Sequence, residues 1–248
     1  MLAAERHSKI LQMISETGVV QVEELAKVLD VSLMTIRRDL EKLKQDGIIE
    51  RCHGGAVIKR EVSYMEKRTL QIEQKMKIAD KCAGYVKKGD TVFLDAGTTT
   101  YEIAKRIRNI SGITVITNDL EIARILLESD VHLMLCGGNV QKSTGSMLGP
   151  FANQMMEDIR TEIAFLGAMS IDDNFNVLTP TLNKAVLKRI ICKNTSRPYL
   201  AVDETKFGKQ ALMRINHLSD YIGVVTNKSL NQEEEQKIRQ MKINMIIV

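Results

Sequence analysis

Apolar positions near the start of the chain recur every three or four residues in three successive segments, which is the spacing of one face of a helix. We expect helices over Ala4–Thr17 and Val22–Leu29, and a third that runs from Ser32 to Lys44. Gly18 is expected to end the first helix, and Ser32 to cap the third by accepting a hydrogen bond from a first-turn N–H. The apolar residues predicted to face inward are Ile10, Leu11, Ile14, Leu25, Val28, Leu29, Ile36, Leu40 and Leu43.

The second and third helices are separated only by Asp30 and Val31, so together they form a helix-turn-helix over about residues 20–39. Val19 to Gln21 is expected to be a short extended bridge before them. Two short strands, Ile48–His53 and Ala56–Lys59, are expected to follow around a turn at Gly54-Gly55. Three helices and a hairpin make a winged helix-turn-helix, which we assign to residues 1–58.

The third helix presents polar and basic side chains near its start, off the apolar face. In a helix-turn-helix, these positions of the second helix meet base edges in the major groove of DNA. Arginine can pair with guanine through two hydrogen bonds, and a threonine methyl group can contact thymine. A lone helix of this pattern would more often be a solvated surface helix, so the prediction depends on its surroundings. Contacts to DNA are predicted for Ser32, Met34, Thr35, Arg37 and Arg38 on the helix and for Arg51 and His53 on the wing.

From Thr91 onward, short apolar runs alternate with amphipathic segments. This alternation predicts an α/β domain over residues 73–248, with a mostly parallel sheet covered by helices on both faces. The charged stretch 59–72 has little apolar period, and we interpret it as a linker in which Tyr64 and Met65 dock on one of the domains. Strands are expected at 91–95, 113–117, 131–136, 162–167, 199–203, 221–226 and 244–248, and helices at 73–86, 101–107, 120–127, 151–159, 182–193 and 232–241.

Small and polar residues follow several of these expected strands, at the edge where parallel α/β sheets bind ligands. A glycine lets the backbone approach an anion, and the free N–H groups and dipole of a helix start favour negative charge. These residue types suit a phosphorylated sugar or polyol, with Asp95 and Asp203 accepting sugar hydroxyls and Lys206 facing the phosphate. A lone G-T-T-T is more often a polar turn, so the prediction depends on several strand ends together. The candidate effector-binding residues are Asp95, Gly97, Thr98, Thr99, Thr100, Thr117, Asn118, Gly137, Gly138, Asp203 and Lys206.

Composition narrows the class of protein. The chain has 248 residues, enough for two domains, and a net charge of +4. Residues 1–60 hold ten Lys or Arg and nine Asp or Glu, so the basic clustering from Arg37 onward, and not net charge, supports DNA binding. It has no run of eighteen apolar residues and no signal core, and we expect a cytoplasmic protein without a membrane span. The four cysteines lack C-x-x-C spacing, so we expect reduced thiols, no metal site and no cofactor.

Residues 5–57 resemble the N-terminal domain of the DeoR family of bacterial regulators of sugar metabolism. The match lies in S-x-x-T-I-R-R-D-L and in G-I-I-x-R-x-H-G-G-A. The segments L-D-A-G-T-T-T, I-T-N, C-G-G, T-G-S-M-L-G-P, L-T-P, V-L-K-R and V-D-E-T-K-F-G resemble the sensor domain of the same family, so the resemblance covers nearly the whole chain. It implies a fold like ribose-5-phosphate isomerase and CoA-transferase-like proteins, and a sugar-phosphate effector at the D-A-G-T-T-T loop.

The alternative function is a sugar-phosphate isomerase fused to a DNA-binding domain. Such isomerases carry D-G-A-D at a strand end and a Glu on the following helix, and these carboxylates move a proton next to a carbonyl. The matching strand here ends in Leu166-Gly167-Ala168-Met169, so both Asp positions are apolar. Asn183, Lys184 and Val186 stand at positions that we match to acidic residues of the family, which puts the usual effector contacts there in doubt and removes the last candidate base.

We therefore expect a transcriptional regulator and not an enzyme. The predicted role is a repressor of a sugar or polyol utilisation operon that binds double-stranded operator DNA and is released by a phosphorylated sugar. One winged helix reads few base pairs, so we expect a homo-oligomer, a dimer or tetramer, that places two heads on half-sites. A structural DNA-packaging protein is a third possibility, but it would leave the polar strand ends without a use.

Overall fold

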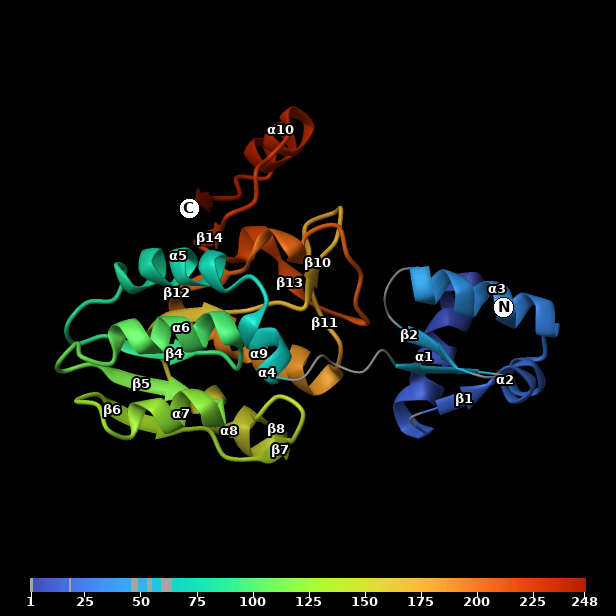
Figure 1. Ribbon diagram of the computed structural model, residues 1–248, viewed down its shortest axis with the longest axis horizontal. Coiled ribbons are helices and arrows are strands. Elements are labelled where there is room, and N and C mark those ends of the chain that lie inside the picture. The colour runs from blue at the N-terminus through green and yellow to red at the C-terminus, as the bar shows by residue number, and fades with distance from the viewer. Residues whose placement is uncertain (1, 18, 46–48, 53–54, 59–63) are drawn as a thin grey trace. The chain divides into compact units, whose positions relative to one another are not determined.

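The computed structural model describes residues 2–17, 19–45, 49–52, 55–58 and 64–248. The chain divides into two compact units (Figure 1). One comprises residues 1–61 together with 209–212, and the other comprises residues 62–208 and 213–248. Separate clusters of buried apolar side chains form the core of each unit, so each has the packing of a domain.

The first unit is a winged helix-turn-helix, as the apolar pattern predicts. Its described residues form three helices, α1 (Ala3–Thr17), α2 (Val22–Leu29) and α3 (Leu33–Gln45). They also form a three-stranded antiparallel sheet in the order β1-β3-β2, with β1 at Val19–Gln21, β2 at Ile49–Cys52 and β3 at Gly55–Ile58. The buried core contains the predicted apolar residues except Val28, which is 60% exposed. The inward face of α2 is centred on Leu25 and Leu29, and Val28 lies well to one side of it.

The hairpin differs from the prediction at Gly55, which lies inside β3 instead of in the turn. Gly55 pairs with Cys52 on one side and with Gln21 on the other. A Cβ atom at this position would lie 2.0 Å from the carbonyl oxygen of Val20, so only glycine allows β1 to pair with β3. The expected bridge at residues 19–21 is therefore the third strand of this sheet. The predicted helix cap Gly18, the turn residue Gly54 and the strand ends Ile48, His53 and Lys59 lie outside the described residues.

The second unit is built on a parallel sheet that confirms the predicted α/β class. Over the described residues, seven strands lie in the order β15-β14-β12-β9-β4-β5-β6, and each pair of neighbours is parallel. All seven fall within or overlap the predicted runs. The strands are β4 (Thr91–Leu94), β5 (Thr114–Thr117), β6 (His132–Leu135), β9 (Thr161–Leu166), β12 (Thr195–Ala201), β14 (Gly223–Thr226) and β15 (Met245–Ile247).

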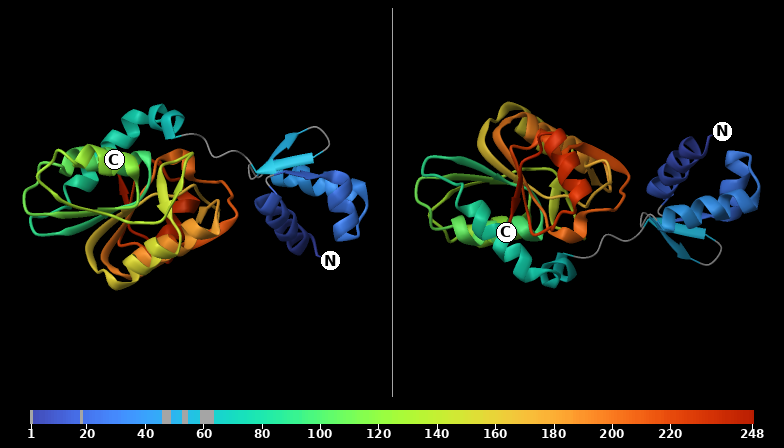
Figure 2. Two further views of the ribbon diagram at one scale, coloured as in Figure 1. Left: turned by 90° about the horizontal axis from the view of Figure 1, so that it is seen from below. Right: turned by 90° about the horizontal axis from the view of Figure 1, so that it is seen from above.

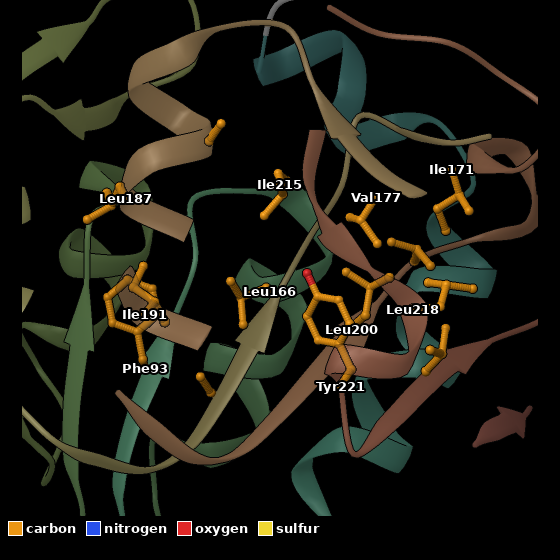
Figure 3. Close-up of a cluster of buried hydrophobic side chains, with 14 of the residues drawn as sticks. Phe93, Leu166, Ile171, Val177, Leu187, Ile191, Leu200, Ile215, Leu218 and Tyr221 are labelled. Atoms are coloured by element: carbon orange, nitrogen blue, oxygen red, sulfur yellow. The ribbon is translucent and has the colours of Figure 1, made fainter. Parts of the chain in front are cut away.

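Helices cover both faces of this sheet (Figures 1 and 2). Alternate residues of β4 enter different cores: Val92 and Leu94 pack with α5, α6 and α7, whereas Phe93 packs with α8 and α9. Figure 3 shows the second of these cores, where Phe93 lies with Leu187 and Ile191 of α9. The helices are α5 (Ile72–Ala83), α6 (Thr98–Ile107), α7 (Leu120–Leu126), α8 (Pro150–Asp158), α9 (Leu182–Lys193) and α10 (Gln232–Gln240).

Several short elements were not expected from the sequence. They include helix α4 (Tyr64–Thr69), which occupies part of the stretch interpreted as a linker. The others are the hairpin β7 (Asn139–Gln141) and β8 (Ser146–Leu148), a small antiparallel sheet of β10 (Ser170–Ile171), β11 (Asn176–Thr179) and β13 (Met213–His217), and the 3-10 turns η1 (Glu204–Lys206) and η2 (Leu218–Asp220). Within the described part of the chain, none of the helices has the length and apolar character needed to span a membrane.

Candidate functional site

The order of the strands places a switch point between β4 and β9. From β4 the chain adds β5 and β6 on one side, and it then adds β9, β12, β14 and β15 on the other. Connections leave the sheet in opposite directions at this point, and in parallel α/β sheets this is where a ligand-binding crevice is expected, beyond the carboxyl ends of the strands. Asp95 follows β4 and Gly167 follows β9, so these two residues flank the crevice.

A buried ion pair between Asp95 and Lys188 lies at this switch point. Asp95 is 2% exposed, and its carboxylate oxygen Oδ2 is bound by the ammonium group of Lys188, on α9. The same oxygen accepts a hydrogen bond from the Gly167 backbone N–H at 2.9 Å, and Lys188 also donates to the Gly167 carbonyl at 2.7 Å. Three parts of the chain thus meet at one carboxylate. Lys184 lies one turn before Lys188 on α9 and is also buried.

The loop after β4 is held in shape by the loop after β5. The Asn118 side chain accepts a hydrogen bond from the Ala96 N–H at 2.9 Å, and the Asp119 carboxylate accepts one from the Gly97 N–H at 3.1 Å. The Thr117 hydroxyl donates to the Leu94 carbonyl at 2.7 Å. These three side chains are at most 1% exposed, so they position the loop.

Asp119 also caps α7. Its other carboxylate oxygen accepts hydrogen bonds from the N–H groups of Glu121 and Ile122 at 2.7 and 3.0 Å. Burial raises the pKa of Asp119 to about 6, although these backbone hydrogen bonds and the one from Gly97 act in the opposite direction. One carboxylate therefore fixes both the start of α7 and the loop that leads into α6.

The first turn of α6 carries the predicted threonines. Thr98, Thr99 and Thr100 begin the helix, where backbone N–H groups have no partner within the helix itself. The Thr100 hydroxyl is buried and donates to the carbonyls of Asp95 and Gly97 at 2.6 and 2.8 Å, so it supports the loop. Thr98 and Thr99 are only partly buried. Their side chains and the first-turn N–H groups are the donors that an anion in the crevice would meet.

The remaining predicted effector residues follow strands that lie farther from the switch point. Asp203 follows β12, where it caps η1 by accepting from the Thr205 N–H at 3.0 Å, and Lys206 ends η1. Gly137 and Gly138 follow the edge strand β6. With neighbouring strands about 4.8 Å apart, the ends of β12 and β6 lie roughly 19 Å apart. The structure thus gathers the residues after β4 and β5, and places Asp203 with Lys206 on one side of them and the two glycines on the other.

Gly138 has a structural reason to be glycine. Its φ is +134°, and a Cβ atom would lie 2.5 Å from the carbonyl oxygen of Leu148. The residue lies directly before β7, whose first residue Asn139 pairs with Leu148 of β8. The close approach of the hairpin backbone therefore requires glycine at this position, independently of any ligand.

The helix α3 presents its first turns to solvent as predicted. Ser32 caps the helix by accepting a hydrogen bond from the Thr35 N–H at 3.1 Å, and the two hydroxyl groups also lie 2.9 Å apart. Arg37 and Arg38 are exposed, and Met34 is 57% exposed. Arg51 lies on β2 opposite Ala56 and is partly buried, while His53 is outside the described residues.

Asp39, between the exposed arginines and the core, holds α3 against α1. It is 6% exposed and binds the Arg6 guanidinium at 2.5 and 3.0 Å and the His7 imidazole at 3.0 Å. Burial alone would raise the pKa of Asp39, but the hydrogen bonds from Arg6 and His7 outweigh it, and the pKa lies below its usual value. The orientation of the arginines next to it therefore depends on an ion pair that the sequence did not reveal.

Three residues that hold the loops after β4 and β9, Lys188, Asp119 and Gly167, were not predicted from the sequence. Lys188 belongs to the V-L-K-R segment, but it was given no role. Asp119 directly follows the predicted I-T-N segment, and Gly167 was considered only as part of an isomerase motif. For Asp119 a signal was present, because an Asp at the start of an amphipathic segment is a preferred helix cap. For Lys188 no local signal exists, since its partner lies 93 residues away.

Both units match models of known protein families. Residues 6–62 match the DeoR-like helix-turn-helix domain, and residues 70–228 match the DeoR C terminal sensor domain. The two matches together cover most of the chain, and the boundary between them falls in the same region as the boundary between the two compact units.

Similar proteins of known name align along nearly their full length. The HTH-type transcriptional regulator GlpR of Haloferax volcanii is 32% identical over 250 residues, which cover 99% of this chain and 98% of that protein. The lactose phosphotransferase system repressor of Staphylococcus aureus is 33% identical over 252 residues, with 98% of each chain covered. Among solved structures, ribose 5-phosphate isomerase A of Methanocaldococcus jannaschii is similar over 55% of this chain and 54% of its own, with 18% identity and a TM-score of 0.40.

Proposed function

Because this chain belongs to the DeoR family of transcriptional regulators, we propose that it represses a sugar or polyol utilisation operon and is released from its operator by a phosphorylated sugar. The observation that supports the effector proposal most is the arrangement of side chains and helix ends at the switch point between β4 and β9. There, the first turn of α6 lies beside the buried Asp95–Lys188 pair. Helix N–H groups suit a phosphate, and a carboxylate suits sugar hydroxyls, so the two chemical halves of a sugar phosphate have separate partners.

Each residue of the proposed effector site has a distinct role. The N–H groups and hydroxyls of Thr98 and Thr99 bind the phosphate, and Lys206 approaches it from the side of β12. Asp95 and Asp203 accept hydroxyl groups of the sugar. Gly97 keeps the backbone open to the ligand. The buried residues Thr100, Thr117 and Asn118 hold the loop in its binding shape, and Gly137 and Gly138 form the outer rim beyond β6.

DNA binding belongs to the first unit. We assign the base and backbone contacts to Ser32, Met34, Thr35, Arg37 and Arg38 on α3, and to Arg51 and His53 on the wing. The exposure of Arg37 and Arg38 supports this assignment, because long basic side chains on a capped helix can enter the major groove without disturbing the core. A transcriptional regulator needs access to the chromosome, so we propose that the protein is cytoplasmic.

The effector site is tested by substituting two of its residues. Thr98→Ala removes a phosphate donor at the helix start, and Lys206→Ala removes a positive charge. Both variants should bind operator DNA like the parent protein but stay bound when a sugar phosphate is added. The measurement is a gel-shift titration with ribose 5-phosphate, glucose 6-phosphate, fructose 6-phosphate and glycerol 3-phosphate, supported by the thermal shift that each compound causes.

A matched control comes from Lys193, an exposed lysine at the end of α9. Lys193→Ala removes the same charge as Lys206→Ala but should leave release by the effector unchanged. Release of the Thr98 and Lys206 variants at the same effector concentration as the parent would place the site elsewhere in the second unit.

The family assignment also decides between regulator and enzyme. The members that resemble this chain over its whole length are transcriptional regulators, and the chain is a regulator and not an isomerase. The strand end after β9 agrees, because Gly167 is followed by Ala168 and Met169, which offer no acid or base.

We further propose that the protein acts as a homo-oligomer, a dimer or tetramer assembled through its second unit. One recognition helix contacts only a few base pairs, whereas two symmetric heads would read half-sites about 34 Å apart or at a multiple of that distance. Analytical ultracentrifugation at micromolar concentration is the test. A monomer that binds its operator with full affinity would contradict the proposal.

A further inference from the structure

Helix α4 is held against the helix that carries the proposed effector loop. The Arg68 guanidinium lies over the ring of Tyr101, 4.5 Å from its centroid, and donates a hydrogen bond to the Tyr101 hydroxyl at 3.0 Å. Tyr64 packs edge-on against the same ring, with 6.3 Å between centroids. Tyr101 belongs to the first turns of α6, and its N–H donates to the Gly97 carbonyl at 3.0 Å. One aromatic side chain therefore connects the proposed anion site to α4.

The first residue of α4 is also close to the loops around the crevice. The Tyr64 N–H donates to the Ser143 carbonyl, in the turn between β7 and β8, at 3.2 Å. The Tyr64 hydroxyl is buried and has no hydrogen-bond partner among the residues that the structure describes. Burial, and then the charges of Asp119 and Glu121 at the start of α7, raise the pKa of this hydroxyl. A buried phenol without a partner is costly, and a small movement of α4 could give it one.

The last turn of α4 is tied to α5 by Lys75. This lysine is 4% exposed, and its ammonium group donates to the carbonyls of Lys67 and Leu70, the latter at 2.5 Å. The pKa of Lys75 is lowered to about 8, mainly by burial. The charges of Lys206 and Lys67 also lower this pKa, while those of Asp203 and Glu102 raise it. The end of α4 thus shares its electrostatic surroundings with Asp203 and Lys206, two of the proposed effector residues.

In the chain, α4 is the first described element after residues 59–63, which lead from the DNA-binding unit. Resting on the effector function proposed above, we propose that α4 is a latch: Arg68 on Tyr101 holds it closed in the DNA-binding state, and an anion bound at the first turn of α6 opens it. The anion attracts Arg68 away from the aromatic ring, since a full negative charge is a stronger partner for a guanidinium than a phenol. Opening releases α4 from α6. Because α4 is at the start of the second unit, its release changes how the DNA-binding unit is connected to that unit.

The proposal predicts that breaking the latch imitates the effector. Arg68→Gln in the full-length protein removes the charge from the Tyr101 ring. Without any ligand, its operator affinity should fall about fivefold or more, the range of typical coupling between two sites. Tyr101→Phe keeps the ring and removes only the hydroxyl acceptor, so it should give a smaller loss of affinity. Arg239→Gln is the matched control, because Arg239 is exposed on α10 and pairs with Glu235 one turn before it on the same helix. Its operator affinity should equal that of the parent.

Operator affinity is measured by fluorescence anisotropy, with melting temperature as a check that each variant is folded. The Arg68→Gln variant should show a smaller thermal shift than the parent with the four sugar phosphates named above, because Arg68 pairs with the bound anion once the latch is open. Unchanged operator affinity in both Arg68→Gln and Tyr101→Phe would overturn the latch. A thermal shift in Arg68→Gln equal to that of the parent would also overturn it, because the bound anion would then not attract Arg68. If none of the sugar phosphates shifts the parent protein, the effector proposal fails, whereas the ligand-free affinities still decide on the latch.

Discussion

The ammonium group of Lys188 binds the carboxylate of Asp95 at the junction of β4 and β9, although the two residues lie 93 positions apart in the chain. Both side chains are buried, at 10% and 2% exposure, and Gly167 completes the arrangement by contributing one donor and one acceptor. Separating such a pair leaves one charge in the interior without its partner. The pair therefore holds the ends of β4 and β9 against α9, and separating its two charges should be costly.

We expect Asp95→Asn and Lys188→Met each to lower the free energy of unfolding by about 3–5 kcal/mol, the usual cost of leaving half of a buried ion pair. The double variant should be less destabilised than the sum of the two single variants, because it leaves no unpaired charge. Urea denaturation of the four proteins measures this cycle. Arg124→Met removes an exposed arginine that pairs with Glu121, and it should cost less than about 1 kcal/mol. Additive effects of Asp95→Asn and Lys188→Met would show that the two charges do not interact.

The sequence predicted the strands of the large sheet and the recognition helix because both depend on local patterns. Apolar runs such as residues 91–94 become buried strands wherever helices cover both faces, and Ser32 caps its helix through a contact three residues away. Residue pairs far apart in sequence were missed for the opposite reason. Nothing near Lys188 or Asp39 indicates that each becomes buried against a charge from another element.

The pattern of apolar residues also did not predict the short helix α4 or the exposure of Val28 on α2. The helix α4 has six residues, too few to show a clear apolar period, and it is fixed by tertiary contacts to Tyr101 and Lys75. Val28 was placed inside because it is apolar, although the buried face of α2 is already filled by Leu25 and Leu29. The domain boundaries, the linker and the roles of the candidate site residues stay predictions.

Substitutions on the recognition helix should separate base contacts from phosphate contacts. Arg37→Ala or Arg38→Ala should weaken operator binding by about 1–3 kcal/mol if the side chain reads a base, with loss of preference at one operator position. A phosphate contact would instead reduce affinity evenly for all sequences and lower the salt dependence. Anisotropy titrations over a series of salt concentrations and single-base operator variants provide both readouts. Wild-type affinity in both variants would remove α3 from the major groove.

Asp119 allows the helix cap and the effector loop to be tested separately. Asp119→Asn keeps one oxygen that can accept from Glu121 and Ile122, but its amide NH₂ group would face the Gly97 N–H, where two donors meet. We expect a folded protein with α7 intact and a loosened β4–α6 loop. The measured result should be a weaker thermal shift with sugar phosphates at a ligand-free melting temperature near that of the parent. Asp119→Ala removes the cap as well. It should lower the free energy of unfolding by about 1 kcal/mol, and so give a lower ligand-free melting temperature than Asp119→Asn. Equal ligand responses in the parent and Asp119→Asn would show that the Gly97 hydrogen bond does not shape the site.

Lys75 predicts how stability depends on pH. Burial lowers its pKa from 10.5 to about 8 in the folded protein, so between these two values the unfolded chain binds more protons than the folded one. Stability from this group therefore rises as pH increases through about 8 toward 10.5, by at most about 3 kcal/mol. Lys75→Met removes this titration. The unfolding free energy of the parent minus that of the variant should therefore increase from pH 7.5 to pH 10. Urea denaturation at a series of pH values measures both free energies. Lys77→Met, at an exposed position on the same helix, should leave that difference independent of pH. A constant difference for Lys75→Met would mean that Lys75 titrates as it does in the unfolded chain, and that its hydrogen bonds to the end of α4 fully compensate for its burial.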